Sequence, residues 1–134
     1  MKEFFIELIT PSKTVFTGKV ESINLPGVLG NFQVLSNHAP MISAFEIGKI
    51  TLRNSEGIDF HYSTSGGFAE VLGNKVLVLS SSVESLDEID TDRARNAAER
   101  AKARISKSSG EKVDISRAEL SLARAINRLK LSGK

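Results

Sequence analysis

The chain has 134 residues, 40% of them hydrophobic and 25% charged, with a formal net charge of +2, a composition typical of one globular domain or one domain with an appendage. It contains no cysteine, which excludes a disulfide framework and a thiolate metal site. The N-terminus lacks the features of a signal peptide, and no apolar run is long enough to span a bilayer, so any membrane association must come through partners.

The charge is divided unevenly along the chain. Residues 1–84 contain six Lys or Arg and eight Asp or Glu, whereas residues 85–134 contain twelve and eight. A basic segment that follows a weakly acidic body indicates an acidic or phosphate-bearing partner for that segment. We predict two domains with these boundaries, 1–84 and 85–134.

The first domain has the pattern of a β-structure. The segments 4–10 and 15–25 are rich in β-branched and aromatic residues and end at Pro11 and at Pro26-Gly27. Many short strands with no helical pattern between them predict an antiparallel sandwich or barrel. The continuous apolar run 76–79 predicts a strand that is covered on both sides.

Glycine and asparagine mark the expected turns of this domain. Gly73-Asn74 lies between two apolar runs and predicts a tight hairpin. The segments 54–57 and 65–67 predict further turns.

The stretch from Gly27 to Pro40 is the most distinctive in the chain. Glycines supply backbone freedom where the chain reverses, and Phe32 and Val34 alternate like a short half-buried strand. Pro40 disfavours the α conformation at the preceding residue, so His38 is expected at an extended corner. A plain polar turn between two strands is the alternative for this corner.

The second domain has helical spacing. A break at 108–110 separates two apolar stripes, which predicts an antiparallel helical hairpin, with Asp90 as the N-cap of the first helix. The first stripe consists mostly of alanine, which buries little area, so the hairpin should be weakly self-stabilising and able to dock or undock. The two stripes are Ala94, Ala97, Ala98, Ala101 and Ile105, and Ile115, Ala118, Leu122, Ile126 and Leu129.

Arginines also recur at helical spacing in this domain, which places each set along one face of its helix. Guanidinium groups bind phosphate and carboxylate in a fork geometry, while a solvated basic face is the alternative. The two sets are Arg93, Arg100 and Arg104 with Lys107, and Arg117, Arg124 and Arg128.

Signals of catalysis are weak. Gly27-x-x-Gly30 lacks the Lys-Ser/Thr ending of a phosphate-binding loop, and no metal-ligand spacing joins His38 and His61. Ser65 lies near glycines but lacks the pattern of a nucleophile elbow. The sequence therefore predicts that the chain is not an enzyme.

Three motifs occur in order along the chain: the corner at 36–40, Gly66-Gly67-Phe68, and Ile89-Asp90-x-x-Arg93-Ala94. With these motifs, the chain closely resembles the epsilon subunit of F-type rotary ATP synthases over essentially its whole length. The resemblance implies a β-sandwich of about ten strands followed by a C-terminal αα hairpin. It implies a non-catalytic central-stalk subunit that couples ion-driven rotation to ATP synthesis. Its C-terminal helices would inhibit ATP hydrolysis.

The resemblance also implies partners and a location. The first domain would bind the gamma subunit and the ring of c subunits, and the helices would meet the alpha and beta subunits. The protein would lie on the cytoplasmic face of a bacterial plasma membrane, or the equivalent face of an organelle membrane, and reach the membrane only through the complex. Nucleic acid is not an expected partner.

Two sets of site residues follow from the resemblance. ATP would act as a regulatory ligand, with no cofactor required, and would bind Glu84, Ile89, Asp90, Arg93, Ala94, Arg100, Arg124 and Arg128. Contacts with gamma and the c-ring would come from Gly30, Asn31, Ser36, Asn37, His38, Ala39 and Pro40. Asn31 departs from the family, because some relatives have an acidic residue there, which weakens the case for a charge-based contact at this position.

Two other functions remain open. A free-standing ATP sensor would close its helices on nucleotide without any partner. A nucleic-acid module would use the basic hairpin, but acidic residues in the same helices and the lack of aromatic residues after Phe68 speak against it.

Overall fold

The computed structural model describes residues 2–107 and 112–132 and divides into two compact units, Met1–Ser85 and Leu86–Lys134, which are described separately. The described part of the first unit has eight strands: β1 (Phe4–Ile9), β2 (Thr14–Val20), β3 (Ser22–Gly27), β4 (Gly30–Leu35), β5 (Met41–Arg53), β6 (Asp59–Leu72), β7 (Lys75–Ser80) and β8 (Val83–Ser85). The second unit has a 3-10 turn η1 (Leu86–Glu88) and the helices α1 (Thr91–Lys107) and α2 (Lys112–Ser132).

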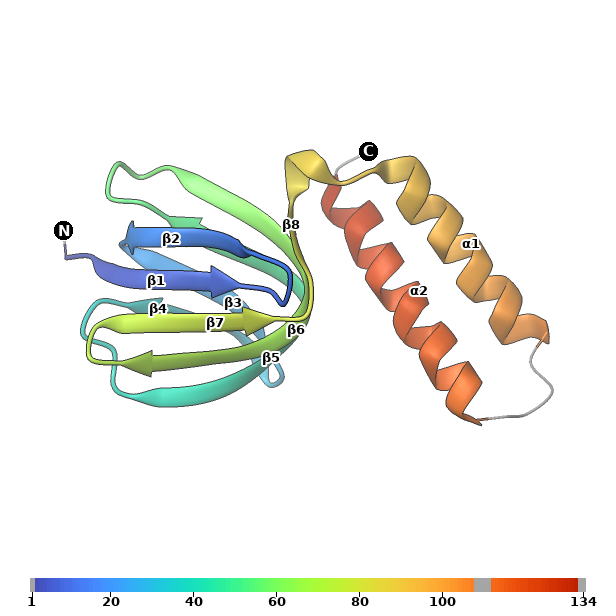
Figure 1. Cartoon of the computed structure of the whole chain (residues 1–134), viewed down its shortest axis with the longest axis horizontal. Helices are drawn as coiled ribbons and strands as arrows, with labels where there is room; N and C mark the ends of the chain where they lie inside the picture. Colours follow the sequence, from blue (N-terminus) through green and yellow to red (C-terminus); the bar gives the residue numbers. More distant parts are fainter. Residues whose placement is uncertain (1, 108–111, 133–134) are drawn as a thin grey trace. The chain divides into compact units, whose positions relative to one another are not determined.

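The strands of the first unit form a sandwich (Figure 1). Their order is β2-β1-β7-β6-β5-β3-β4, with β8 paired to β6, and only the pairing of β1 with β7 is parallel among those described. The first half of β6 pairs with β8 and its second half pairs with β7. The long strands β5 and β6 therefore serve both layers, and counting their halves separately gives about ten strands, in agreement with the predicted β-sandwich.

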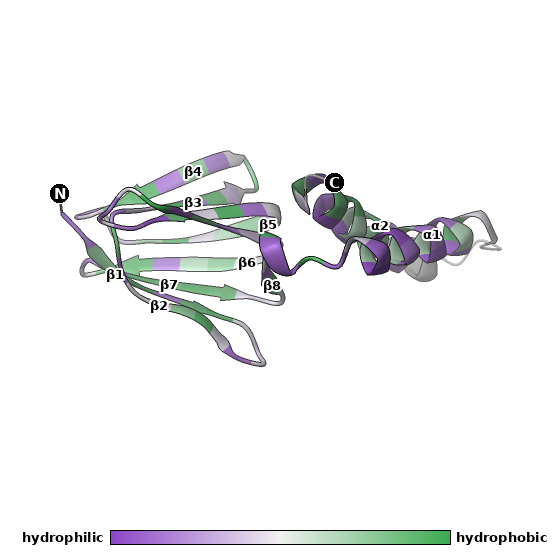
Figure 2. Ribbon diagram, turned by 90° about the horizontal axis from the view of Figure 1, so that it is seen from above, coloured by the Kyte–Doolittle hydropathy of each residue, from purple (hydrophilic) through white to green (hydrophobic). Residues whose placement is uncertain are grey.

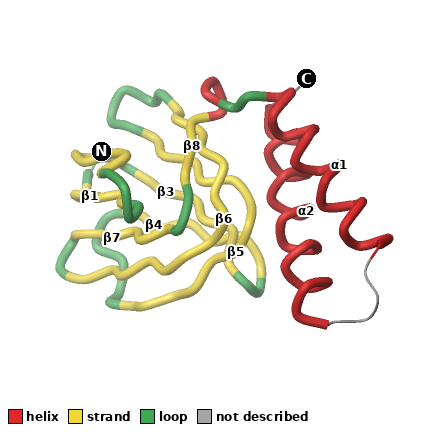
Figure 3. Tube along the Cα trace, turned by 45° about the vertical axis from the view of Figure 1, so that its right-hand side comes forward, coloured by secondary structure: helices red, strands yellow, loops and turns green. Residues whose placement is uncertain are grey.

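Burial along the two long strands shows where each passes between layers. In β5 the buried side is at odd-numbered positions up to Phe45 and at even-numbered positions from Ile50 onward. In β6 the change is the reverse, from even-numbered positions such as Tyr62 to odd-numbered positions from Ala69 onward. Because side chains alternate strictly along a strand, this change requires a bend or irregularity in between. The curvature of β5 and β6 is visible in Figure 3.

The glycines of β6 lie at its bend. Gly66 has a φ of 105°, and a Cβ on Gly67 would collide with the carbonyl oxygen of Leu79 on β7. The turn predicted at 65–67 is therefore wrong: these residues lie inside one strand, and their glycines allow the bend and the close approach of β7.

One predicted strand is divided in two. The segment 15–25 separates at Glu21 into β2 and β3, because the chain leaves one layer there and enters the other. The predicted end at Pro26-Gly27 agrees with β3, which ends at Gly27 before a hairpin turn at Val28-Leu29. The tight turn at Gly73-Asn74 is confirmed, with φ values of 59° and 60°, as a type I′ hairpin requires.

The core of the sandwich lies between the layers and consists mainly of branched aliphatic side chains. Phe16 and Phe60 meet at its rim, with ring centroids 6.2 Å apart. Figure 2 shows hydrophobic colour along β7 and hydrophilic colour along much of α1. Fully buried members of the core include Ile6, Leu8, Val20, Ile23, Leu25, Ile50, Leu52 and Val78.

The second unit is the predicted helical hairpin, with α1 and α2 side by side and antiparallel (Figures 1 and 3). Asp90 caps α1 as predicted, since its Oδ1 accepts the backbone N–H of Arg93 at 3.0 Å. The predicted break at 108–110 lies outside the described residues.

The contact between the helices follows the predicted stripes with one correction. Ala94, Ala98 and Ala101 are buried on α1, as predicted. On α2, Ala125 is buried and Ile126 is 49% exposed, although the prediction placed Ile126 in the stripe. An alanine allows closer approach of the backbones than an isoleucine, so the smaller neighbour occupies the contact. The side chain of Ile115 lies outside the described set.

Candidate functional sites

Six arginines of the hairpin lie at the same position in the helical period relative to the contact between α1 and α2. Each comes directly before a residue of that contact: Arg93, Arg100, Arg104, Arg117, Arg124 and Arg128 precede Ala94, Ala101, Ile105, Ala118, Ala125 and Leu129. One residue is about 100° of rotation on an α-helix, so all six lie on the same flank of their helices. Arg128 is half-buried, and the other five are exposed.

The two arginine sets share one face of the hairpin. An antiparallel helix pair has an approximate two-fold axis normal to the plane of the helices, so equivalent flanks lie on the same side. On α1 and α2, the structure describes three acidic side chains, those of Asp92, Glu99 and Glu119. Each is rotated by at least about 100° from the contact between the helices, toward the flank opposite the arginines. We call the side with the six arginines the arginine face.

The opposite side of α1 neutralises its own cations. Arg95 lies 3.3 Å from Asp92, and Lys102 lies 3.8 Å from Glu99. Pairs of this kind on a helix surface contribute little stability, but they leave positive potential concentrated on the arginine face.

The residues of the predicted ATP motif have distinct local roles. Ile89 and Ala94 are buried, and Asp90 accepts the capping hydrogen bond. Arg93 is exposed on the arginine face. The structure thus brings Arg93, Arg100, Arg124 and Arg128 to one face of one unit, while Glu84 belongs to β8 of the other unit.

The residues predicted to contact gamma and the c-ring form two groups. Gly30 and Asn31 begin β4, next to the exposed hairpin tip at Val28-Leu29. The corner, residues 36–40, follows the end of β4. A strand of six residues separates the groups by about 17 Å, so they do not form one surface patch along β4.

Hydrogen bonds define the shape of the corner. Asn37 has a φ of 60°, in the left-handed region, and its backbone N–H donates to Oδ1 of Asn74 at 2.9 Å. The Nδ1–H of His38 donates to the carbonyl oxygen of Ala39 at 2.8 Å. The chain then enters β5 at Met41, which pairs with Val71.

The sandwich also has an apolar outer face that the sequence analysis missed. Phe68 pairs with Leu79, and Leu79 is next to Ile9 on β1, so their side chains form a row across three strands. Phe68 is 61% exposed and Leu79 is 47% exposed. The run 76–79 is therefore not covered on both sides as predicted. Ile42 and Leu72, at 73% and 61% exposure, lie on the same side of the sheet, where the exposed Glu70 separates them from Phe68.

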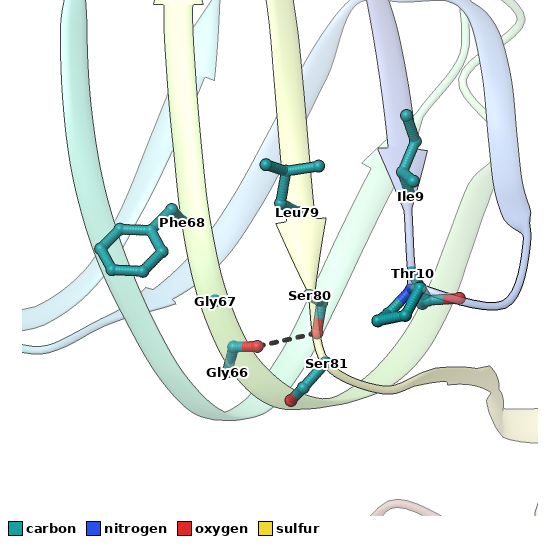
Figure 4. A pocket seen from close by; sticks show the side chains of 9 residues that line it. Ile9, Thr10, Gly66, Gly67, Phe68, Leu79, Ser80 and Ser81 are labelled. Atoms are coloured by element: carbon teal, nitrogen blue, oxygen red, sulfur yellow. Dashed lines mark hydrogen bonds between the residues drawn. The ribbon is translucent and has the colours of Figure 1, made fainter.

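A hollow of about 550 Å³ lies at one end of the apolar outer face (Figure 4). It is lined by Ile9, Thr10, Pro11, Gly66, Gly67, Phe68, Leu79, Ser80 and Ser81. Its floor is fixed by Ser80, whose hydroxyl donates to the carbonyl oxygen of Gly66 at 2.8 Å and lies 2.8 Å from Oγ1 of Thr64. The hollow thus lies at the bend in β6, where Gly66 and Gly67 have no side chains to fill it.

The other outer face of the sandwich is polar. Oγ1 of Thr51 lies 3.0 Å from Nδ1 of His61, and Arg53 donates two hydrogen bonds to Asp59 at 2.7 and 3.1 Å. These hydrogen bonds lower the pKa of the Asp59 carboxyl below its usual value of 3.8, and they raise the pKa of Arg53. Among the described residues, this face has no counterpart of the apolar row formed by Phe68, Leu79 and Ile9 on the other face.

Two kinds of site are not found in the part of the chain that the structure describes. No group of three or more His, Cys, Asp or Glu side chains could hold a metal ion. Within the same residues, no helix is both long and apolar enough to cross a membrane.

The class of protein is a β-sandwich followed by a helical hairpin, and comparison with known families identifies it further. Residues 3–86 match the family model described as "ATP synthase, Delta/Epsilon chain, beta-sandwich domain". Residues 87–133 match the family model described as "ATP synthase, Delta/Epsilon chain, long alpha-helix domain". The chain therefore belongs to the delta/epsilon chain family of ATP synthase, as its motifs predict. The epsilon chain is a non-catalytic subunit, so the prediction that this chain is not an enzyme agrees with its family.

Named relatives support this assignment over the full chain. An ATP synthase epsilon chain of Nitratidesulfovibrio vulgaris (strain DP4) is 42% identical over 132 residues, covering 98% of this chain and 97% of the relative. That of Halalkalibacterium halodurans is 35% identical over 134 residues and covers both chains completely.

Solved structures show the same fold. A chain in the Euglena gracilis mitochondrial ATP synthase, in a structure of OSCP, F1 and c-ring, has a TM-score of 0.80 and 25% identity, covering 93% of this chain and 78% of that one. A chain from the central stalk and c-ring of the Tetrahymena thermophila enzyme has a TM-score of 0.70 at 11% identity, covering 98% and 97%.

Proposed function

We propose that this chain is a central-stalk subunit that couples ion-driven rotation to ATP synthesis and regulates ATP hydrolysis through its helices. The observation that carries the first part is the apolar outer face of the sandwich. A row of exposed large apolar side chains is unusual on a chain that acts alone and marks a surface that a partner covers. The Euglena relative comes from a structure that contains F1 and the c-ring, which supports an assembled state.

We infer that the gamma subunit covers this face. Phe68, Leu79 and Ile42 stand on rigid paired strands, and the hollow beside Phe68 can receive an apolar side chain of the partner. The corner at 36–40 leads directly into β5 beside Ile42, so it borders the same face. We infer that the c-ring contacts the hairpin tip at Val28-Leu29, where Leu29 is fully exposed.

Substitution on the two outer faces tests the gamma contact. Phe68→Glu should abolish co-purification of the full chain with the gamma subunit of its own synthase, because a buried, unpaired carboxylate is costly. Thr51→Glu, on the polar outer face, is the control and should leave co-purification unchanged. Equal co-purification of both variants with gamma would contradict the assignment.

We infer that ATP binds the arginine face as a regulatory ligand. The arginine face brings together Arg93, Arg100, Arg124 and Arg128 only when the two helices are paired, and the acidic side chains that the structure describes on α1 and α2 lie on the opposite flank. Guanidinium groups suit the charge and geometry of a triphosphate. ATP bound there would stabilise the closed hairpin by mass action.

Thermal unfolding with and without millimolar ATP tests this site. The wild-type chain should unfold at a higher temperature with ATP, and Arg124→Ala should lose that shift. Arg95→Ala removes an arginine from the opposite side of α1 and should keep the shift. A shift that survives Arg124→Ala would place the nucleotide elsewhere. No shift in the wild type would leave the stalk role standing and remove ATP from the regulation.

We further infer that the open hairpin reaches the alpha and beta subunits and inhibits hydrolysis, at the cytoplasmic face of the membrane. The alanine contact between the helices supports this, because it can be exchanged for other contacts at small cost. Removal of residues 86–134 should raise ATP hydrolysis by the assembled enzyme. Unchanged hydrolysis would remove the inhibitory role.

A free-standing ATP sensor is the alternative function. It shares the arginine face but gives no role to the apolar outer face. Binding of ATP by a chain that never co-purifies with gamma would favour it.

A further inference from the structure

We propose that Asn74, in the turn between β6 and β7, is a positioning residue that holds the partner-binding corner at 36–40 in shape. The role of the corner in binding rests on the proposed function. The positioning itself rests on hydrogen bonds within the sandwich.

Asn74 joins three segments that are far apart in the sequence. Its Oδ1 accepts the backbone N–H of Asn37 at 2.9 Å, and its Nδ2 donates to the carbonyl oxygen of Glu3 at 3.0 Å. Its own carbonyl oxygen accepts the N–H of Phe5 at 3.2 Å. One side chain therefore connects the N-terminal segment, the turn after β6 and the corner after β4.

The turn alone does not require an asparagine at this position. Gly73 and Asn74 both have a φ near 60°, which glycine adopts as readily as asparagine. What asparagine adds is an amide with both an acceptor and a donor. The acceptor binds an N–H of the corner, and the donor binds a C=O of the N-terminal segment. The asparagine side chain is therefore needed for contacts outside the turn.

The corner needs such support because its backbone is unusual. Asn37 is in the left-handed region, where the chain turns away from β4, and no regular strand pairing holds its N–H. The bond to Asn74 fixes the direction in which the chain leaves β4 and presents His38. A corner that is already ordered loses less freedom on binding a partner, which strengthens the binding.

The substitution Asn74→Gly isolates the side chain, because it keeps the turn and removes both amide hydrogen bonds. Exchange of the Asn37 amide with solvent should rise, and affinity of the full chain for the gamma subunit should fall about fivefold, the worth of one hydrogen bond. Asn74→Asp keeps an acceptor for Asn37 but cannot donate to Glu3. It should preserve both the protection of Asn37 and the affinity.

Asn54→Ala is the matched control. Oδ1 of Asn54 accepts the N–H groups of Glu56 and Ile58, both at 3.0 Å, in the turn between β5 and β6. This variant also loses two side-chain hydrogen bonds, but it should leave Asn37 exchange and gamma affinity unchanged.

The outcomes separate this inference from the proposed function. Unchanged Asn37 exchange in Asn74→Gly overturns the positioning role, whatever happens to binding. Faster exchange with unchanged affinity shows that the corner is held by Asn74 but does not contribute to the gamma contact, which overturns the link between them. A wild-type chain that does not bind gamma contradicts the proposed function, while the exchange measurement still decides the positioning.

Discussion

The sandwich and the hairpin of this chain are stabilised by different amounts of buried apolar surface. The sandwich buries large side chains such as Ile6, Leu8 and Ile50 completely. On α1 and α2, the fully buried side chains that the structure describes are all alanines. Since stabilisation scales with the apolar area buried, at about 25 cal/mol per Å², the sandwich has much the larger reserve.

The difference matches what each unit is proposed to do. A stalk subunit needs one part that keeps a fixed surface toward its partners while torque passes through it. A regulatory element needs a second part whose closed state is only slightly favoured, so that a ligand can shift it. Large core residues provide the first property, and an alanine contact beside an arginine face provides the second.

Cutting into the sandwich core should give the largest effect. Ile6→Ala should lower the free energy of unfolding of the sandwich by about 3 kcal/mol, because it removes a fully buried side chain and leaves a cavity. Phe5→Ala, one residue away on the outer side of β1, should cost less, because the Phe5 side chain is 37% exposed and lies outside the core. Denaturant unfolding of both variants measures this, and equal losses would mean that the core does not lie between the layers.

A smaller effect is expected from the polar network at the bend of β6. Ser80 is buried and its hydroxyl bonds to Gly66 and Thr64, so Ser80→Ala should cost about 1 to 3 kcal/mol because these buried hydrogen bonds are lost together. Ser81→Ala is the control, because its hydroxyl meets that of Ser65 in an exposed pair at 2.7 Å. Thermal unfolding should separate the two variants clearly, and a similar loss in both would contradict a structural role for the buried network.

Local signals were enough to predict much of the fold. Gly73-Asn74 predicted its turn, Asp90 predicted the start of α1, and alanines at helical spacing predicted the helical hairpin. Each of these patterns acts within a few residues, so the sequence alone contains the cause.

The errors come from interactions between distant segments. Gly66 and Gly67 suggested a turn, but these glycines are needed because a long strand bends there and passes close to Leu79 of β7. Ile126 fitted the helical period, yet the smaller Ala125 takes the contact, because close packing with α1 decides between two positions one residue apart.

The candidate sites divide in the same way. The arginines on each helix were found by their spacing, but their common face depends on the pairing of two helices. The run 76–79 did contain a signal for the apolar outer face, because a strand with an apolar residue at every position has apolar side chains on both sides of its sheet. That one side of this strand stays exposed within the chain could not be read from the run. Asn74 carried no local sign of its bond to Asn37.

Removing the helix cap should have a small effect confined to the hairpin. Asp90→Ala should destabilise α1 by about 1 kcal/mol, since the N–H of Arg93 loses its acceptor. Because the alanine contact adds little, this loss should appear as faster amide exchange in α1 with no change in the sandwich. Asp90→Asn keeps a capping acceptor and should behave as the wild type, so fast exchange in both variants would assign the effect to the charge instead.

The smallest effect should come from the exposed pair Arg53–Asp59 on the polar outer face. Because Arg53 lowers the pKa of Asp59 in the folded chain, the pair stabilises the fold above the usual carboxyl pKa of 3.8 and loses this contribution as the pH falls below it. Asp59→Asn should therefore be slightly less stable than the wild type at pH 7, and the difference should shrink below about pH 4. The pair is exposed, so salt should also reduce the difference. Thermal unfolding of both chains from pH 2 to 7 measures it. A difference that grows toward low pH would show that Asp59 stabilises the fold in its protonated form and would contradict the ion pair as the cause.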